Sequence, residues 1–160
     1  MRAWLLMLAL LAPAAEAACN DPPRPKVDWR RCGLEEHRHP RAQLAGADLR
    51  EARLNRGDFS QADLGQIDGR RAKFISARLP GARLDGAKLV EADFTRADLS
   101  GASLKDADLT RARLFDTNLR GADLSGARID GADFLSADLS GATWTDGKTV
   151  CAEGSHGACN

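Results

Sequence analysis

The fold is decided by residues 97–111, which read Ala97-Asp98-Leu99-Ser100-Gly101, Ala102-Ser103-Leu104-Lys105-Asp106 and Ala107-Asp108-Leu109-Thr110-Arg111. The same pattern extends in both directions. From Leu44 to Trp144 every fifth residue is large and apolar, except Gly69. The residue two places before it is almost always Ala, and the exceptions are Gly57, Ile67 and Thr117. The chain is therefore an internal repeat with a period of five.

A period of five fits neither a helix nor a long strand. On an α-helix each fifth residue is rotated by about 140° from the last, so the large residues would form no stripe. In one long strand successive large residues would point to opposite faces. Within a repeat, however, the small and large residues lie two apart and share one side of an extended segment. If the chain turns after each pair, all pairs face inward, which predicts a solenoid.

Glycine indicates where the corners lie, because it tolerates the positive φ that a type II turn needs. In many repeats the second residue after the large one is Gly: Gly46, Gly81, Gly86, Gly101, Gly121, Gly126, Gly131 and Gly141. Arg, Glu, Asp, Gln or Ser stands there in the others, and those corners are expected to be of another type. A narrow interior explains the Ala preference, since only one bulky side chain fits per side. Ile67 beside Gly69 then indicates an exchange of volume within one repeat.

The Ala-(Asp/Arg/Asn)-Leu-x-x pattern, as in residues 92–96 and 122–126, resembles that of the pentapeptide repeat family. The resemblance covers most of the chain. It implies an all-β fold, a right-handed quadrilateral β-helix with four pentapeptides per coil and about six coils.

One column of charges supports four repeats per coil. Residues twenty apart would then be stacked, and the column Arg31, Glu51, Arg71, Glu91 and Arg111 alternates in sign. Three repeats per coil would instead align arginines, and like charges directly opposite one another are unfavourable. The charge pattern therefore favours four.

Residues 1–17 are predicted to be a signal peptide. Arg2 precedes an apolar stretch, Pro13 interrupts it, and Ala15-Glu16-Ala17 matches a cleavage site. Lipidation of Cys19, as in a lipoprotein, is disfavoured because it would need a Leu-like residue at position 16, where Glu16 stands. The apolar stretch is short for a membrane span, so no stable membrane insertion is expected. The protein is expected to be exported, to the periplasm or the extracellular space.

The remaining chain divides into a Pro-rich lead-in (18–26), the repeat solenoid (27–146) and a C-terminal cap (147–160), which resembles a cap of exported family members. Trp29 and Trp144 occupy the first and last large positions and are predicted to cover the two ends, because open solenoid ends must be protected.

Cysteine occurs twice near each end: Cys19, Cys32, Cys151 and Cys159. If the solenoid has about six coils, its ends lie roughly 29 Å apart, far beyond the reach of a disulfide. Pairing within each end, Cys19 with Cys32 and Cys151 with Cys159, is therefore expected. The sequence does not show whether both bonds form. The spacings fit neither a CxxC redox pair nor a zinc site.

His37 and His39 interrupt the pattern, and the repeat is expected to depart from regularity at residues 37–41. A His-x-His pair suggests a metal, but no third ligand is evident in the sequence, and a structural role is favoured. No cofactor or metal is expected.

Charge argues against several functions of such a rod. Mimicry of DNA toward type II topoisomerases, which the resemblance offers as an alternative, needs a strongly negative surface, whereas the chain has 23 Lys and Arg against 23 Asp and Glu. Direct nucleic-acid binding needs a basic stripe, which the sequence lacks, so this function is not expected either. Carboxylates that recur in every coil indicate a solvated surface and not a tuned acid–base pair, so an enzyme is not expected.

One column of outward positions is apolar and supports a structural or interaction module. Ile75, Thr95, Phe115 and Leu135 lie twenty apart just after a large residue, with Val90 on the adjoining side. Exposed apolar strips often mark contact surfaces. The alternatives are scattered surface residues or packing beneath the lead-in. The predicted occupant is an unknown protein partner or a second copy of the chain.

Overall fold

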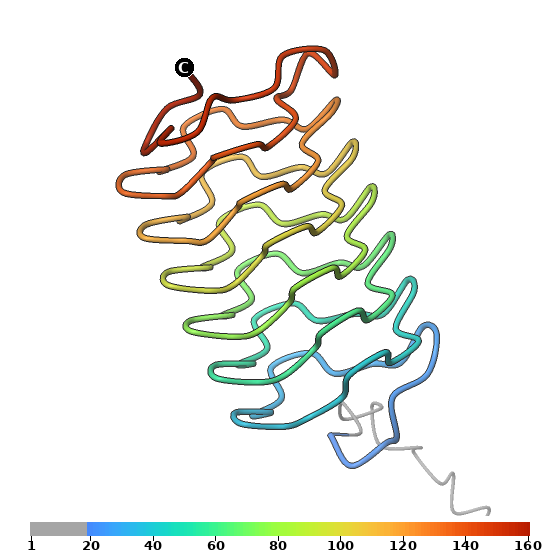
Figure 1. The fold of residues 1–160 in the computed structure, drawn as a ribbon. Helices are drawn as coiled ribbons and strands as arrows, with labels where there is room; N and C mark the ends of the chain where they lie inside the picture. Colours follow the sequence, from blue (N-terminus) through green and yellow to red (C-terminus); the bar gives the residue numbers. More distant parts are fainter. Residues whose placement is uncertain (1–18) are drawn as a thin grey trace, which may run out of the picture.

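The computed structural model describes residues 19–160, which wind into coils stacked along one axis (Figure 1). The predicted signal peptide lies outside the described residues. The backbone bridges within the repeats are parallel and join residues twenty apart, from Asp28↔Asp48 to Asp123↔Thr143. Four pentapeptides therefore complete one coil, as the alternating charge column predicts.

The secondary structure of residues 19–160 consists of single-residue bridges separated by turns, with no helix or longer strand in this range. Within this range no helix is long and apolar enough to cross a membrane.

Hydrogen bonds between coils pair the backbone at the sides and at the corners. The N–H of the large residue donates to the next coil, as from Leu109 to the C=O of Arg128 at 2.8 Å. The N–H of Arg128 donates back to the C=O of Ala107 at 2.9 Å. At the corner the N–H of Arg111 donates to the C=O of Asp130 at 2.9 Å. Each coil thus depends on its neighbours for hydrogen bonds, as in other solenoids.

The corners share one conformation, and the expectation of two corner types is wrong. Gly101 has φ 62°, but Arg96 has φ 57° and Asp106 has φ 54°. Each turn is closed by a hydrogen bond, as from the N–H of Ala102 to the C=O of Leu99 at 3.0 Å. Positive φ at the third residue of the turn is the signature of type II. The hydrogen bonds between coils hold this conformation even where the side chain disfavours it.

Non-glycine corners are therefore strained, and Arg96→Gly should stabilise the protein. Arg96 is exposed and forms no ion pair with the other described residues. A left-handed conformation costs a non-glycine residue about 1 kcal/mol, of which the greater freedom of unfolded glycine offsets roughly half. Chemical denaturation should show a net gain of about 0.5 kcal/mol. Arg96→Val, in contrast, should be destabilising because β-branched residues avoid this region. Equal stability of the two variants would contradict the corner assignment.

The interior is filled by the small and large residues of each repeat, whose side chains are almost wholly buried. Equivalent large residues stack in columns along the axis. The rings of Phe74 and Phe94, one coil apart, lie parallel with their centroids 4.8 Å apart. Thr117 occupies a small position, and its buried hydroxyl donates to the C=O of Phe94 at 2.8 Å. The buried hydroxyl of Thr117 thus has a hydrogen-bond partner, as buried polar groups require.

Volume is exchanged within repeats in two places. A Cβ on Gly69 would lie 3.4 Å from Cδ1 of Ile67 and 2.9 Å from Cδ2 of Leu89. Ile67 therefore fills space that a large residue at position 69 would take, as the sequence predicts. The reverse exchange occurs at Gly57, where a Cβ would lie 2.6 Å from Cε2 of Phe59. The interior thus constrains the sum of the two side chains and not each one alone.

Both cysteine pairs form disulfides, with Cα atoms 5.4 Å apart for Cys19–Cys32 and 4.8 Å apart for Cys151–Cys159. The first bond ties the lead-in to the first coil, and the second closes the C-terminal tail on itself. At the first end the indole N–H of Trp29 also donates to the C=O of Asp21 at 3.2 Å. The predicted domain boundaries at residues 26 and 146 stay predictions.

Candidate interaction surface

The apolar column lies along one corner of the coil, because each member follows a large residue and occupies the second position of a type II turn. This position directs the side chain outward. Asn55 lies one coil before Ile75 in the same column, and its Oδ1 accepts a hydrogen bond from the N–H of Ile75 at 3.2 Å. We call Ile75, Thr95, Phe115 and Leu135 the apolar corner.

Exposure increases along the apolar corner toward the C-terminal end. Ile75 and Thr95 are half-buried, whereas Phe115 is 40% exposed and Leu135 is 63% exposed. The other large, exposed apolar residue in the described chain is Val150, in the C-terminal tail. The residues that a partner could reach most readily are therefore Phe115 and Leu135.

Val90 lies apart from the apolar corner, at the preceding corner of the coil. It lines a shallow hollow whose other residues are charged: Arg50, Glu51, Arg70, Arg71, Glu91 and Arg111. Because its neighbours are charged, Val90 does not extend the apolar strip.

The alternating charge column forms three of the four ion pairs that its register predicts. Glu91 bridges Arg71 at 2.8 Å and Arg111 at 2.6 Å, and Arg31 lies 3.5 Å from Glu51. Hydrogen bonding to Arg71 is the largest cause of a lowered pKa for Glu91. Exposed pairs of this kind contribute little stability, about 0–1 kcal/mol each.

A second charged network was not anticipated from the sequence. An Asp-x-Arg unit recurs one coil apart, and each arginine binds the aspartate of its own unit, as Arg50 does with Asp48 at 2.6 Å. Arg50 also lies 3.7 Å from Asp68 in the next coil. The units at 28–30, 48–50 and 68–70 are visible in the sequence once the coil length is known. The network neutralises most of this face.

His37 and His39 do not disturb the backbone, so the expected departure at residues 37–41 is wrong. The N–H of His39 donates to the C=O of Asp58 at 2.7 Å, as at any large position. The His39 ring lies between Trp29 and Phe59, with centroids 5.6 and 6.0 Å away. Within residues 19–160 no three His, Cys, Asp or Glu side chains gather as a metal site would require. His39 thus occupies the position of a large residue and is partly buried against aromatic neighbours.

His39 should make the N-terminal end sensitive to mild acid. Burial, and secondarily the charge of His37, lower the pKa of His39. The unfolded chain then binds more protons than the folded one as pH falls below about 6.5, so stability is lost on acidification. His39→Leu should raise stability at pH 5.5 and shrink the difference between pH 7.5 and pH 5.5 in urea denaturation. His156→Asn, a change at the exposed histidine of the tail, should keep that difference. A difference that survives in His39→Leu would contradict this account.

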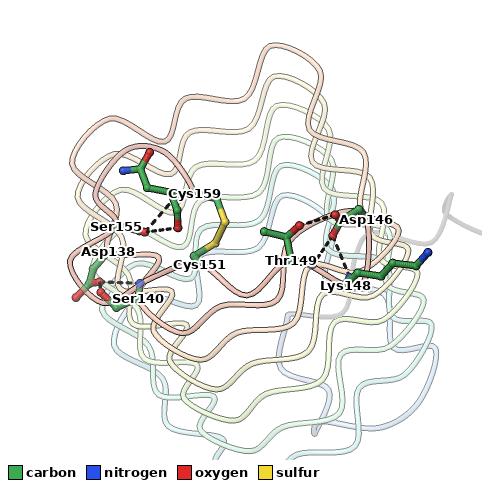
Figure 2. Close-up of a disulfide and its surroundings, with 9 residues drawn as sticks. Asp138, Ser140, Asp146, Lys148, Thr149, Cys151, Ser155 and Cys159 are labelled. Carbon is green, nitrogen blue, oxygen red and sulfur yellow. Dashed lines mark hydrogen bonds between the residues drawn. A yellow bond between two sulfur atoms is a disulfide. The ribbon is translucent and has the colours of Figure 1, made fainter.

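The C-terminal tail lies over the last coil beside Asp138 and Ser140, and the Cys151–Cys159 bond closes it (Figure 2). Its bridges, Thr143↔Val150 and Asp138↔His156, are antiparallel. Buried Ser140 donates to Oδ1 of Asp138 at 2.6 Å and accepts from the N–H of Gly154 at 3.0 Å. The hydrogen bond from Ser140 is the largest cause of a pKa of about 2 for Asp138. The tail is thus anchored by polar contacts.

Trp144 lies at the last large position and is only partly buried, with its ring centroid 5.7 Å from that of Phe134. At the first position Trp29 is almost fully buried. Both tryptophans lie where the sequence places them, next to segments tied down by disulfides.

Solved structures of pentapeptide repeat proteins resemble this one, among them two from cyanobacteria. HetL from the cyanobacterium Nostoc sp. strain PCC 7120, a pentapeptide repeat protein involved in the regulation of heterocyst differentiation, is 36% identical over 77% of this chain, with a TM-score of 0.51. This chain covers 64% of HetL. Rfr23 from Cyanothece 51142 is 26% identical over 66% of this chain and 81% of its own, with a TM-score of 0.52.

Among curated proteins no sequence matches the chain. The family model for pentapeptide repeats matches eight copies, at residues 42–65, 70–106 and 107–143. These matches span more than half of the chain and lie in the regular coils. With the twenty-residue coil and the filled interior, they show that this chain belongs to the pentapeptide repeat family.

Proposed function

We propose that this protein is a non-enzymatic interaction module that binds a protein partner, or a second copy of itself, through the apolar corner. In this proposal a right-handed quadrilateral β-helix of about six coils serves as a rigid support. The observation that carries it is the exposure of Phe115 and Leu135, which are one coil apart in the same column of the surface. Contiguous exposed apolar side chains often mark a contact surface.

The charge distribution supports this proposal over DNA mimicry. A mimic must present a continuous negative surface in place of a phosphate backbone. Here the net charge is zero and charges of both signs are interspersed, with Glu91 held between Arg71 and Arg111. The column of Arg71, Glu91 and Arg111 would repel the basic DNA-binding groove of another protein as much as it attracts it.

We also propose that the protein acts outside the cytoplasm, in the periplasm or the extracellular space. Two features support this location. The first seventeen residues have the pattern of a signal peptide, and both cysteine pairs lie at bonding distance, which an oxidising compartment favours.

Affinity capture with two matched variants tests the proposed function. The tagged protein, Phe115→Glu and Val150→Glu are each used to recover partners from the envelope and secreted fractions of the native host, and light scattering gives their mass in solution. Phe115→Glu should lose the partner or the self-association. Val150→Glu changes an exposed apolar residue elsewhere and should keep it. Equal association by all three proteins would overturn the proposal.

A further inference from the structure

The C-terminal end of the solenoid is covered over only half of its perimeter. Over residues 137–144 the tail supplies the next layer of hydrogen bonds. The N–H groups of Leu139, Gly141 and Trp144 donate to the C=O groups of Ser155, Cys151 and Thr149, at 2.8, 2.9 and 2.8 Å. The C=O groups of Ala137 and Ala142 accept from the N–H groups of Gly157 and Cys151, each at 2.9 Å.

The other half, residues 127–136, receives no backbone hydrogen bonds from a further layer within the described chain, and we call it the open edge. The tail reaches only its end, where a Cβ on Gly157 would lie 3.7 Å from the O of Phe134 and from the N of Ser136. The coil beneath shows what is missing, since its N–H groups donate to residues 128–135 at each equivalent position. Six backbone groups of the open edge, whose equivalents in the coil beneath bond to the next layer, have no hydrogen-bond partner within residues 19–160: the N–H groups of Ile129, Gly131, Phe134 and Ser136, and the C=O groups of Ala127 and Ala132. Four donors and two acceptors therefore point along the axis from this edge.

The interior is also less covered at the open edge. Ile129 and Ala132 are only partly buried, and Phe134 is 8% exposed. The residues beneath them, Leu109, Ala112 and Leu114, are fully buried, as is Leu139 under the tail. Leu135, the most exposed member of the apolar corner, is part of this edge.

The charges at the open edge are incompletely matched. Asp130 and Asp133 form no ion pair with any residue in 19–160, and Arg128 has its one partner, Asp108, in the coil beneath at 3.5 Å. A layer placed above would therefore be favoured by an acidic group over Arg128 and a basic group over Asp133.

We propose that the open edge binds an extended segment of a partner protein as one further layer of the solenoid. The segment carries two small-x-large units, with an acidic residue between the first pair and a basic residue between the second. This inference rests on the proposed role as an interaction module and specifies how the partner is held. Addition of a strand to an exposed edge is a general mode of peptide recognition, in which backbone hydrogen bonds give affinity and alternate side chains give specificity.

The chain itself argues for this occupant. Its own tail lies on the neighbouring half of the same end and pairs with it through two single antiparallel bridges, at Val150 and His156. A second copy is disfavoured, because the tail stands one layer above the open edge and keeps a flat solenoid end from reaching it (Figure 1). A single extended segment fits within that step.

The coil beneath supplies the sequence of a probe. Residues 107–116 lie directly under residues 127–136 and are Ala-Asp-Leu-Thr-Arg-Ala-Arg-Leu-Phe-Asp. A synthetic peptide of this sequence, placed on top, would set its aspartate at position 2 over Arg128 and its arginine at position 7 over Asp133. Its backbone would bond the four donors and two acceptors in the pattern of the coils below. Extended peptides added to a single edge bind weakly, with Kd of about 0.1–1 mM.

Titration of the isotope-labelled protein with this peptide, followed by amide NMR, tests the proposal. Shifts should concentrate at residues 127–136. A peptide N-methylated at positions 2 and 7 loses both of its donors to the edge and should not bind. Asp133→Arg should weaken binding of the parent peptide by about threefold to tenfold. A peptide with aspartate at position 7 should recover that loss.

Each outcome bears on the proposal separately from the proposed function. Binding of the N-methylated peptide, shifts spread over other faces, or indifference to Asp133→Arg would each overturn the edge as the site. Those results would leave the capture experiment with Phe115→Glu intact, because Phe115 is in the coil below. Specific peptide binding together with capture that ignores Phe115→Glu would support the edge and overturn the role of the apolar corner.

Discussion

Ile67→Ala is expected to destabilise the protein by about 3 kcal/mol, because it opens a cavity that no neighbour can fill. In other repeats the large residue at the position of Gly69 fills this space, but Gly69 has no side chain. The surrounding coils are held by hydrogen bonds on both sides and cannot move in to fill the cavity. The free energy of unfolding, obtained by urea denaturation monitored by circular dichroism, measures the effect.

Gly69→Leu is the second single variant of a double-mutant cycle with Ile67→Ala. Alone it should cost about 1–3 kcal/mol through overpacking, since its Cβ would already lie 2.9 Å from Cδ2 of Leu89. Combined with Ile67→Ala it restores the common small-x-large repeat and should return stability close to that of the parent. Additive losses in the double variant would show that the two residues do not share one space.

Replacement of both Cys151 and Cys159 by serine is expected to release the tail and to lower stability by about 2–3 kcal/mol. The tail then loses its closure, and the edge formed by residues 137–144 becomes accessible. Exposed strand edges promote association between chains, so light scattering should also detect larger species.

Amide hydrogen exchange locates the effect within the molecule. The N–H groups of Leu139, Gly141 and Trp144 are bonded to the tail and should exchange much faster in the double serine variant. The N–H groups of Ile129 and Phe134 have no partner in the described chain and should exchange fast in both proteins. Unchanged protection at Leu139 would show that the tail holds its place without the disulfide.

Much of the fold follows from the sequence, since the small and the large inward-facing residue can be recognised in each repeat. The coil length follows from the alternating column that includes Arg71 and Glu91, and the cysteine pairing follows from the length of the rod. The exchange between Ile67 and Gly69 is visible in the sequence because it breaks two columns at once. These features depend only on periodicity and volume.

Other features could not be predicted because they depend on contacts between coils. Arg96 and Asp106 adopt a conformation that their own preferences oppose, since hydrogen bonds to the next coil fix it. His39 appears in the sequence as an interruption, yet it occupies the position of a large residue between two aromatic rings. The half-covered C-terminal end could not be predicted from the sequence for another reason. The tail from Val150 to Cys159 has no repeat, and tertiary contacts set its path.

The uniform corner has a consequence for how such a chain can change its length. Since each pentapeptide turns the backbone by the same amount, insertion or deletion of one unit would rotate everything downstream by a quarter of a revolution. The apolar corner would then be divided between two edges, and Arg111 would no longer lie above Glu91. Gain or loss of twenty residues would keep every column aligned. Duplication in whole revolutions is therefore the route by which this rod could lengthen while keeping its surface pattern.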